Sequence, residues 1–422
     1  MYSADWILRL TRFGREARSL RGWSVPSNIW GLGVTSLLTD ISSEMVVSIL
    51  PAYLVVSGGL APLALGIATG LHEGGPLLAA WLGGLVADRS ARRKLTAGAG
   101  YALSAISRLG WLVMSSQTLQ AIGLLVVGDR IGKAMRTAPR DAMISLSVPP
   151  ARLAAGFGVH RALDAAGAAL GPLLAFAILW RLPRRFDVIF FTSFVVAALG
   201  LAALALLVDE YPPDRRHRLR DKARLRWPDT VAAFGDRSVR PVLILAAAFS
   251  LVTVSDAFIY LALVQRARAG ALWIPLLYTG TAIAFLLLAV PAGLAADRIG
   301  KRRVFVLGHT FLLLAYAAAF AGPAAWPVNA IGCVALLGAY YASSDGVLAA
   351  IASGVLPEGA RALGLAWVAT AVSLARLCNA AAFGLLWTRA GDRAAFLTFA
   401  TALVVVLGFA LARPAPDQAA PS

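Results

Sequence analysis

Long apolar stretches recur along the chain and are separated by short polar segments. Each comes close to the roughly 20 residues that an α-helix needs to cross a bilayer, whereas a strand of a membrane barrel needs only about 10. Because lipid offers no partners for backbone polar groups, stretches of this length are predicted to be helices. The predicted spans are 28–57, 60–86, 95–114, 119–142, 154–180, 187–208, 239–264, 272–296, 304–324, 327–353, 362–387 and 394–412.

These spans form two groups of six on either side of one hydrophilic segment. Near the N-terminus, residues 4–22 place apolar side chains on one helical face and arginines on the other, which is typical of a helix lying flat on a membrane. The predicted organisation is an amphipathic N-terminal segment (1–27), a six-helix bundle (28–208), a basic linker (209–238), a second six-helix bundle (239–412) and a tail (413–422).

Composition supports a membrane protein, because 59% of the 422 residues are hydrophobic and only 14% are charged, while the net charge is +17. Soluble domains carry about 25% charged residues, and a nucleic-acid binder needs a large solvated basic face. The basic residues gather at 1–27, 87–94, 209–241 and 297–303. The positive-inside rule then predicts that both termini are cytoplasmic, in a multi-pass protein of the cytoplasmic (inner) membrane with no nucleic-acid partner. One loop, residues 181–185, opposes this orientation because it holds three arginines.

A charged motif occurs twice at matching positions. Between spans 2 and 3 the chain reads GLVADRSARR from Gly84, and between spans 8 and 9 it reads GLAADRIGKRR from Gly293. Span 1 contains Asp40 and span 7 contains Asp256 at a similar offset. Two homologous six-helix halves explain this repetition.

The repeated motif resembles the loop motif G-x-x-x-D-R-x-G-R-R of the major facilitator superfamily. The resemblance implies two pseudo-symmetric bundles, helices 1, 4, 7 and 10 around a central cavity, alternating access, a monomer and no cofactor. It also implies a cytoplasmic gate, for which the matching residues are Asp88, Arg89, Arg92, Asp297, Arg298 and Lys301. The motif glycine is expected to supply an unusual turn, and in the first copy Ala91 replaces it, so that loop is expected to turn differently.

Span 5 holds a second motif, Gly167-Ala-Ala-Leu-Gly171-Pro172. It resembles the core of a motif found in drug/proton antiporters of the superfamily, although Ala175 and Phe176 replace its trailing glycines. Small residues four apart also allow close helix packing, so this motif has a purely structural interpretation as well. Segments of spans 1, 4 and 5 resemble a prokaryotic branch known as efflux or drug-resistance permeases.

Charged side chains inside the spans concentrate in the first half, where they are costly unless they are paired or hydrated. Asp129, Lys133, Arg136 and Arg140 recur at helical spacing and are predicted to share one face of span 4. Asp40, Glu44, Glu73, Asp129 and Asp164 outnumber Arg130, Lys133, Arg136 and Arg161 by one. Either the groups neutralise one another as a structural network, or one acid binds a proton and couples transport to it.

Candidate roles follow from these positions. The proton-coupling candidates are Asp40, which is placed first because it lies near the membrane centre, followed by Glu44, Asp129, His160 and Asp164. The substrate-cavity candidates are Lys133, Arg136, Arg130, Asp256, Tyr340 and Trp367. Arg140 and Asp141 are predicted to pair with the Asp88 loop in the gate.

The chain shows no motif of a soluble enzyme. It has no phosphate-binding glycine loop, and His72-Glu73 does not continue into a zinc-binding H-E-x-x-H because position 76 is proline. We therefore expect no enzymatic activity, cofactor or metal. The leading hypothesis is a secondary transporter that exports a small molecule in exchange for protons. The alternatives are an organic-anion carrier or exchanger that uses the span-4 cations, and a non-transporting membrane receptor or scaffold.

Overall fold

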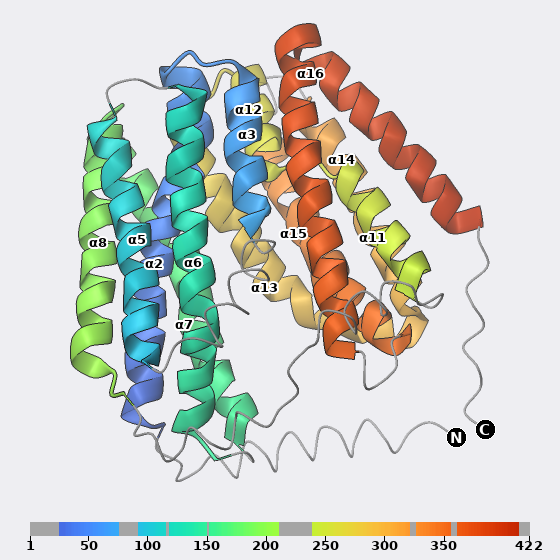
Figure 1. Cartoon of the computed structure of the whole chain (residues 1–422). Helices are drawn as coiled ribbons and strands as arrows, with labels where there is room; N and C mark the ends of the chain where they lie inside the picture. Colours follow the sequence, from blue (N-terminus) through green and yellow to red (C-terminus); the bar gives the residue numbers. More distant parts are fainter. Residues whose placement is uncertain are drawn as a thin grey trace, which may run out of the picture.

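The computed structural model describes residues 25–75, 92–114, 118–149, 152–210, 239–320, 326–355 and 361–412 (Figure 1). The first half contains α2 (Ser27–Leu50), the π-helix η1 (Pro51–Ser57), α3 (Pro62–Glu73), α5 (Arg93–Val113), α6 (Leu119–Ser147), α7 (Leu153–Arg181) and α8 (Phe186–Leu207). The second half contains α11 (Val239–Val252), α12 (Asp256–Arg266), the 3-10 helix η4 (Ala271–Trp273), α13 (Ile274–Ile299), α14 (Lys301–Ala319), α15 (Trp326–Val355) and α16 (Arg361–Ala412).

Each predicted span overlaps a described helix. Eight described helical stretches are long and apolar enough to cross a membrane. The last of them, Gly364–Ala412, covers two predicted spans, and Gly391, with φ 85°, interrupts the helix between them. The all-helical membrane fold is therefore confirmed, while the number of twelve spans stays a prediction. The predicted amphipathic segment and tail lie outside the described residues, as does all of the predicted linker except its first two residues.

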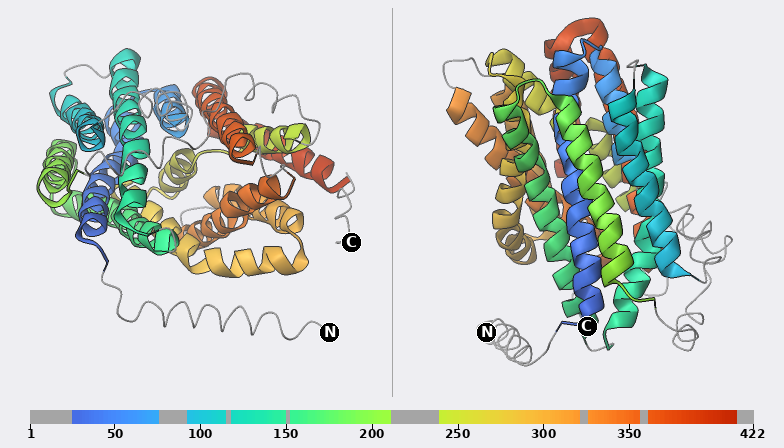
Figure 2. Two further views of the ribbon diagram at one scale, coloured as in Figure 1. Left: turned by 60° about the horizontal axis from the view of Figure 1, so that its bottom comes forward. Right: turned by 90° about the vertical axis from the view of Figure 1, so that its left-hand side faces the viewer.

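The two halves repeat the same helix pairings. In the first half α2 packs against α7, α3 against α6 and α5 against α6. In the second half the corresponding pairs are α11 with α16, α13 with α15 and α14 with α15. Figure 2 shows the two groups side by side when the bundle is viewed along its helices. The internal repeat predicted from the sequence thus appears as a repeated packing pattern.

Two seams join the halves, α3 with α16 and α7 with α13. A Cβ atom built on Gly66 would lie 2.4 Å from the carbonyl oxygen of Ala380, so the helices of the first seam approach at backbone distance. The Leu63 N–H donates to Thr388 Oγ1 at 3.0 Å in the same seam. In the second seam Thr279 Oγ1 donates to the Ala169 carbonyl oxygen at 3.4 Å. These contacts lie at the end of the bundles opposite the chain termini, where α3 begins (Figure 1).

The second motif copy forms the sharp turn between α13 and α14. Gly300 has φ 100° and ψ 133°, a conformation that side-chain-bearing residues rarely adopt. This observation agrees with the expectation that the motif glycine supplies an unusual turn. The first copy, including Asp88, Arg89 and Ala91, lies outside the described residues.

Candidate functional site

Six of the charged candidates are carried by α6, a helix of 29 residues that crosses the first half. Thr118 caps its start, because the Thr118 side chain accepts a hydrogen bond from the Ala121 N–H at 3.3 Å. The charged side chains of α6 face α2, α3, α5 and α7, all of which pack against it or against its neighbours. The helix thereby brings cations to the acids of α2 and α7.

Asp129 lies at the centre of a buried cluster with two arginines. Its carboxylate is 3.2 Å from Arg108 Nη2 and also accepts a hydrogen bond from Arg130. Arg108 and Arg130 are only 2% and 5% exposed, and Arg130 also reaches Ser43 Oγ at 3.5 Å. A buried guanidinium needs such a partner, because removal of the partner would leave an uncompensated charge in a region of low polarity.

Arg108 was not predicted as a site residue from the sequence. Its position inside an apolar stretch could have indicated that its charge is buried. Arg161, which the sequence analysis counted with the buried cations, is exposed. Arg108 therefore takes the place of Arg161 in the first-half network. Among the described residues, the acids of the network still exceed its cations by one. The acids are Asp40, Glu44, Glu73, Asp129 and Asp164, and the cations are Arg108, Arg130, Lys133 and Arg136.

Arg136 and Arg130 are buried against neighbouring helices of the first bundle. Arg136 is 3% exposed, its guanidinium lies 4.5 Å from the centre of the Tyr101 ring, and its Nη2 is 3.9 Å from Asp40 Oδ1. Both arginines turn toward α2 and α5, because there they meet polar or charged groups and an aromatic face. Contact of these two arginines with a substrate stays a prediction.

Lys133 differs from its neighbours because its side chain is exposed. Its ammonium interacts electrostatically with Asp40 and Glu44 on α2. Of the three predicted substrate-cavity cations of span 4, Lys133 alone keeps an accessible charge in the described structure. Nearer the helix end, Arg140 Nη2 pairs with Asp141 Oδ1 at 2.9 Å, and the predicted partner loop lies outside the described residues.

Asp164 of α7 faces α2. Its Oδ1 accepts a hydrogen bond from the Ser36 hydroxyl at 2.6 Å, and its carboxyl group interacts electrostatically with that of Asp40. His160, one turn earlier, is 3% exposed, and its Nε2 has no hydrogen-bond partner among the described residues. The structure thus brings three of the five proton-coupling candidates, Asp40, Asp164 and His160, to one side of the bundle.

The glycine motif of span 5 lies at the contact between α7 and α2. Cβ atoms built on Gly167 and Gly171 would each lie 2.6 Å from a backbone carbonyl oxygen of α2, those of Leu37 and Ile41. The same atoms would lie 3.1 Å from the Cβ of Asp40 and 2.9 Å from the Cβ of Glu44. The two glycines therefore place α7 directly on the acidic face of α2, and Pro172 follows them within the helix.

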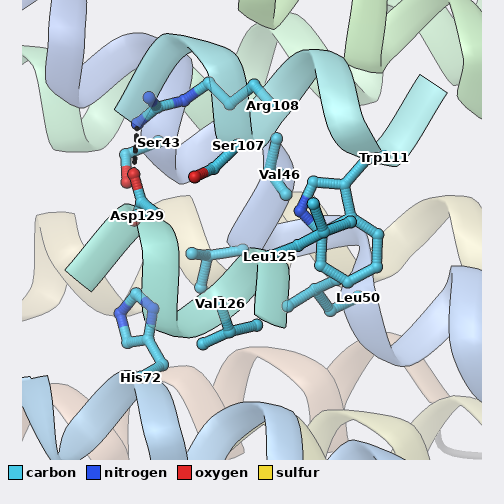
Figure 3. A pocket seen from close by; sticks show the side chains of 11 residues that line it. Ser43, Val46, Leu50, His72, Ser107, Arg108, Trp111, Leu125, Val126 and Asp129 are labelled. Carbon is cyan, nitrogen blue, oxygen red and sulfur yellow. Dashed lines mark ion pairs between the residues drawn. The ribbon is translucent and has the colours of Figure 1, made fainter. Parts of the chain in front are cut away.

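A small cavity borders the Asp129 cluster. It measures about 30 Å³, which is enough room for a water molecule. Figure 3 shows the Arg108–Asp129 ion pair on one side, with His72, Ser107 and Trp111 also lining the space. The cavity therefore leaves room for one water molecule beside the network, inside the first bundle.

In the second half, span 7 is a broken helix. After α11 ends at Val252, α12 begins at Asp256, whose Oδ1 accepts a hydrogen bond from Tyr341 at 2.8 Å. The Tyr316 hydroxyl donates to the Val252 carbonyl at 3.2 Å and accepts from the Val254 N–H at 2.7 Å. Such partners allow a helix to break at membrane depth, because they satisfy the freed backbone groups.

Sequence reasoning did not find Tyr316 or Tyr341, because nothing in the sequence marks the break that they stabilise. Tyr340, which was predicted to face substrate, is only 3% exposed and packs against the rings of His309 and Tyr341. Contact of Tyr340 with a substrate stays a prediction. Trp367 is partly buried in an apolar cluster around α11, α15 and α16.

Acids of both halves lie within electrostatic reach of Tyr278 on α13. Its hydroxyl interacts with Asp256, Glu44 and Glu73. These residues come from α12, α2 and α3, so the interaction joins the two halves. In the described part of the gate motif, Asp297 and Arg298 are exposed, Arg92 precedes α5, and Lys301 Nζ donates to the Ala350 carbonyl at 3.3 Å.

Known proteins resemble this chain along most of its length. "Uncharacterized MFS-type transporter MJ1317" of Methanocaldococcus jannaschii is 31% identical over 396 residues, which covers 91% of this chain and 94% of that protein. "Uncharacterized protein Rv2265" of Mycobacterium tuberculosis is 28% identical over 314 residues, with 72% of this chain and 73% of that protein covered.

Solved transporter structures share the fold at low identity. A mutant of the nucleoside transporter NupG superposes with a TM-score of 0.77 at 15% identity, covering 91% of this chain and 99% of that one. A POT family transporter in complex with 5-aminolevulinic acid gives a TM-score of 0.71 at 14% identity, with 92% and 96% covered. The family model described as Major Facilitator Superfamily matches residues 32–278 and 268–422. Since this match spans nearly all of the helical region, the chain belongs to the Major Facilitator Superfamily.

Proposed function

We propose that this membrane transporter couples the export of a small molecule to the inward movement of protons. The observation that carries the proposal is the position of Asp40. It lies in the contact between α2 and α7, where Asp164 and Lys133 interact with it electrostatically and Arg136 is 3.9 Å away. A carboxyl group with both acidic and basic neighbours changes its bonding when it gains or loses a proton.

The coupling follows from that exchange of partners. With a proton bound, Asp40 has less attraction for Arg136 and Lys133, and α6 is freer to move relative to α2. Without the proton, the carboxylate draws the same cations back. A proton shifts the conformational equilibrium only if it binds the two access states with different affinity, and a change of partners provides that difference.

The rest of the proposal concerns the protein in its membrane. The two halves rock about the α3–α16 and α7–α13 seams, as expected for a fold of two parallel repeats. The exporting direction rests on the resemblance of the span-5 glycine motif to that of drug/proton antiporters. We place the protein in the cytoplasmic (inner) membrane as a monomer, with both termini cytoplasmic, without enzymatic activity or a cofactor, and with the proton gradient as its energy source.

A second candidate function is the transport of an organic anion. The exposed Lys133 favours it, because an accessible ammonium group can bind a carboxylate or phosphate. Arg130 and Arg136 are engaged within the first bundle, so this function would depend on Lys133 alone among the predicted cations of span 4.

Everted membrane vesicles carrying an imposed pH gradient test the proposal. We expect at least one compound from a panel of lipophilic cations and small carboxylic acids to dissipate the gradient in wild-type vesicles. Asp40→Asn should abolish this effect, whereas Asp187→Asn, at an exposed ion pair with Arg185, should not. Reconstituted Asp40→Asn should still exchange the same compound across the membrane, because its neutral side chain mimics the protonated form.

Two results would count against these assignments. If Asp40→Asn vesicles still couple compound movement to the pH gradient, Asp40 is not the essential proton site. If Lys133→Met leaves the movement of a carboxylic acid unchanged, the organic-anion function is eliminated. No coupled movement for any compound in the panel would contradict proton-coupled transport of these two substrate classes.

A further inference from the structure

The contact between α2 and α7 brings two carboxyl groups together. Asp164 lies one helical turn before Gly167 on α7, and the Gly167 Cβ position is 3.1 Å from the Cβ of Asp40. Because glycine has no side chain at this point, the two helices approach closely enough for their acids to meet. Asp40 and Asp164 therefore share one inter-helix seam.

The contacts of the two groups are specific. The Ser36 hydroxyl donates to Asp164 Oδ1 at 2.6 Å, and Ser36 lies one helical turn before Asp40 on α2. Asp164 therefore meets α2 beside Asp40, and the two carboxyl groups interact electrostatically. Arg136 Nη2 approaches Asp40 Oδ1 only to 3.9 Å, so no cation lies in close contact with Asp40 among the described residues.

An ionised carboxylate can only accept hydrogen bonds. Two carboxylates can consequently bond to each other only when a proton lies between them, and two negative charges this close would repel strongly. We infer that Asp40 and Asp164 share one proton and act as a single proton-binding unit. This inference rests on the proposed function and deepens it, because it replaces a single coupling residue with a pair.

The charge count of the network supports a shared proton. Among the described residues, Asp40, Glu44, Glu73, Asp129 and Asp164 exceed the cations Arg108, Arg130, Lys133 and Arg136 by one. A single proton on the Asp40–Asp164 pair makes the two sides equal. A buried network close to neutrality is expected in a membrane, where an unbalanced charge is costly.

The groups that face the pair come from three helices. Lys133, Arg136 and Arg140 belong to α6, Tyr101 to α5 and His160 to α7. Loss of the shared proton leaves two negative charges opposite these cations. The pair would then separate and each carboxylate would bind a cation of α6, which is the exchange of partners that coupling requires.

Infrared spectroscopy of the purified protein at neutral pH tests the inference directly. A protonated carboxyl group has its own C=O stretching band, which an ionised carboxylate lacks. We expect Asp40→Asn and Asp164→Asn to lose the same part of this band, equal to one carboxyl group. The double variant should lose no more than either single variant, because the two residues hold one proton together.

The controls separate this result from general damage. Asp187→Asn should leave the band unchanged, because Asp187 is an exposed residue paired with Arg185. Ser36→Ala keeps both acids and should shift the frequency of the band, which provides a measurement even if the Asn variants fail to fold. Any one of three results would overturn the shared proton. They are a full band in Asp164→Asn, additive losses of the band in the double variant, and a band that Ser36→Ala leaves unchanged.

Different results would refute the shared proton and the proposed proton-coupled transport. The band belongs to the resting protein and needs no substrate. A shared proton in a protein that moves no protons with substrate would refute proton-coupled transport and keep the pair. Coupled transport with an unchanged band in Asp164→Asn would refute the pair and leave Asp40 as a single site.

Discussion

Asp129 is the residue on which the largest part of the buried charge depends. It is the partner of Arg108 at 3.2 Å and also of Arg130, while the Nε atoms of both arginines have no hydrogen-bond partner within the described chain. The carboxylate therefore compensates two cations at once. Its removal would leave both of them in an environment that stabilises charge poorly.

We predict that Asp129→Asn destabilises the protein by about 3–5 kcal/mol, the range typical of breaking a buried ion pair. The measurement is the midpoint of thermal unfolding in detergent. Asp187→Asn is the matched control, because its ion pair with Arg185 is more than half exposed on the arginine side and is screened by solvent. Equal midpoints for wild type and Asp129→Asn would show that the cluster contributes little to stability.

The double variant Arg108→Gln/Asp129→Asn carries a further prediction. Removing both partners takes away one buried cation together with its acid. The loss of stability should therefore be smaller than the sum of the losses in the two single variants. Additive losses in the same unfolding measurement would show that Arg108 and Asp129 act independently despite their 3.2 Å contact.

Residue patterns predicted where the charges lie but not how they pair. The helical spacing of α6 predicted one shared face for its charged side chains, yet it could not predict that Arg136 turns toward Tyr101 while Lys133 stays exposed. Those directions depend on α2 and α5, which are distant in sequence. Arg108 was missed for the same reason, since its importance comes from Asp129 on another helix.

At the scale of helices, glycines decide how closely the elements approach. A Cβ at Gly66 would lie 2.4 Å from the Ala380 carbonyl oxygen in the α3–α16 seam. We predict that Gly66→Ala widens this seam. Cysteines replacing Leu63 and Thr388, whose backbone N and Oγ1 atoms are 3.0 Å apart, should form a disulfide readily in the parent and less readily in Gly66→Ala.

Gly332→Ala on α15 is the matched control for that experiment, because a Cβ there meets nothing within 4 Å. Cys333 and Cys378 are replaced in all of these variants, so that only the introduced pair can form a disulfide. If Gly66→Ala forms the disulfide as fast as the control, the close approach of α3 and α16 does not depend on this glycine.

The turn between α13 and α14 gives an independent prediction. Gly300 has φ 100°, so Gly300→Ala should destabilise the protein by about 1–3 kcal/mol through backbone strain. Gly293→Ala, in the same motif but in open space within α13, should be neutral or stabilising. Thermal unfolding of the two variants distinguishes them, and an equal response would contradict the strain.

At the scale of the whole molecule, the fold was largely predictable because each membrane-spanning helix corresponds to a long apolar stretch in the sequence. The positions of the predicted spans and the repeated Asp-Arg motif predicted two similar bundles. The repeated pairings of α2 with α7 and of α11 with α16 agree with this prediction. The break in span 7 was not predictable. It depends on Tyr316, which supplies partners for the freed backbone only after the chain has folded.

The two seams and the exposure of Lys133 together determine the side from which the centre is reached. Both seams lie at the end opposite the termini, while Lys133 is accessible near the middle of α6. With the Leu63→Cys/Thr388→Cys disulfide holding one seam closed, Lys133→Cys should react with a membrane-impermeant maleimide in inside-out vesicles but not in right-side-out vesicles. This direction follows from the proposed cytoplasmic position of the termini. Labelling in right-side-out vesicles alone would reverse the topology, and labelling from both sides would show that the closed seam does not seal the centre of the transporter.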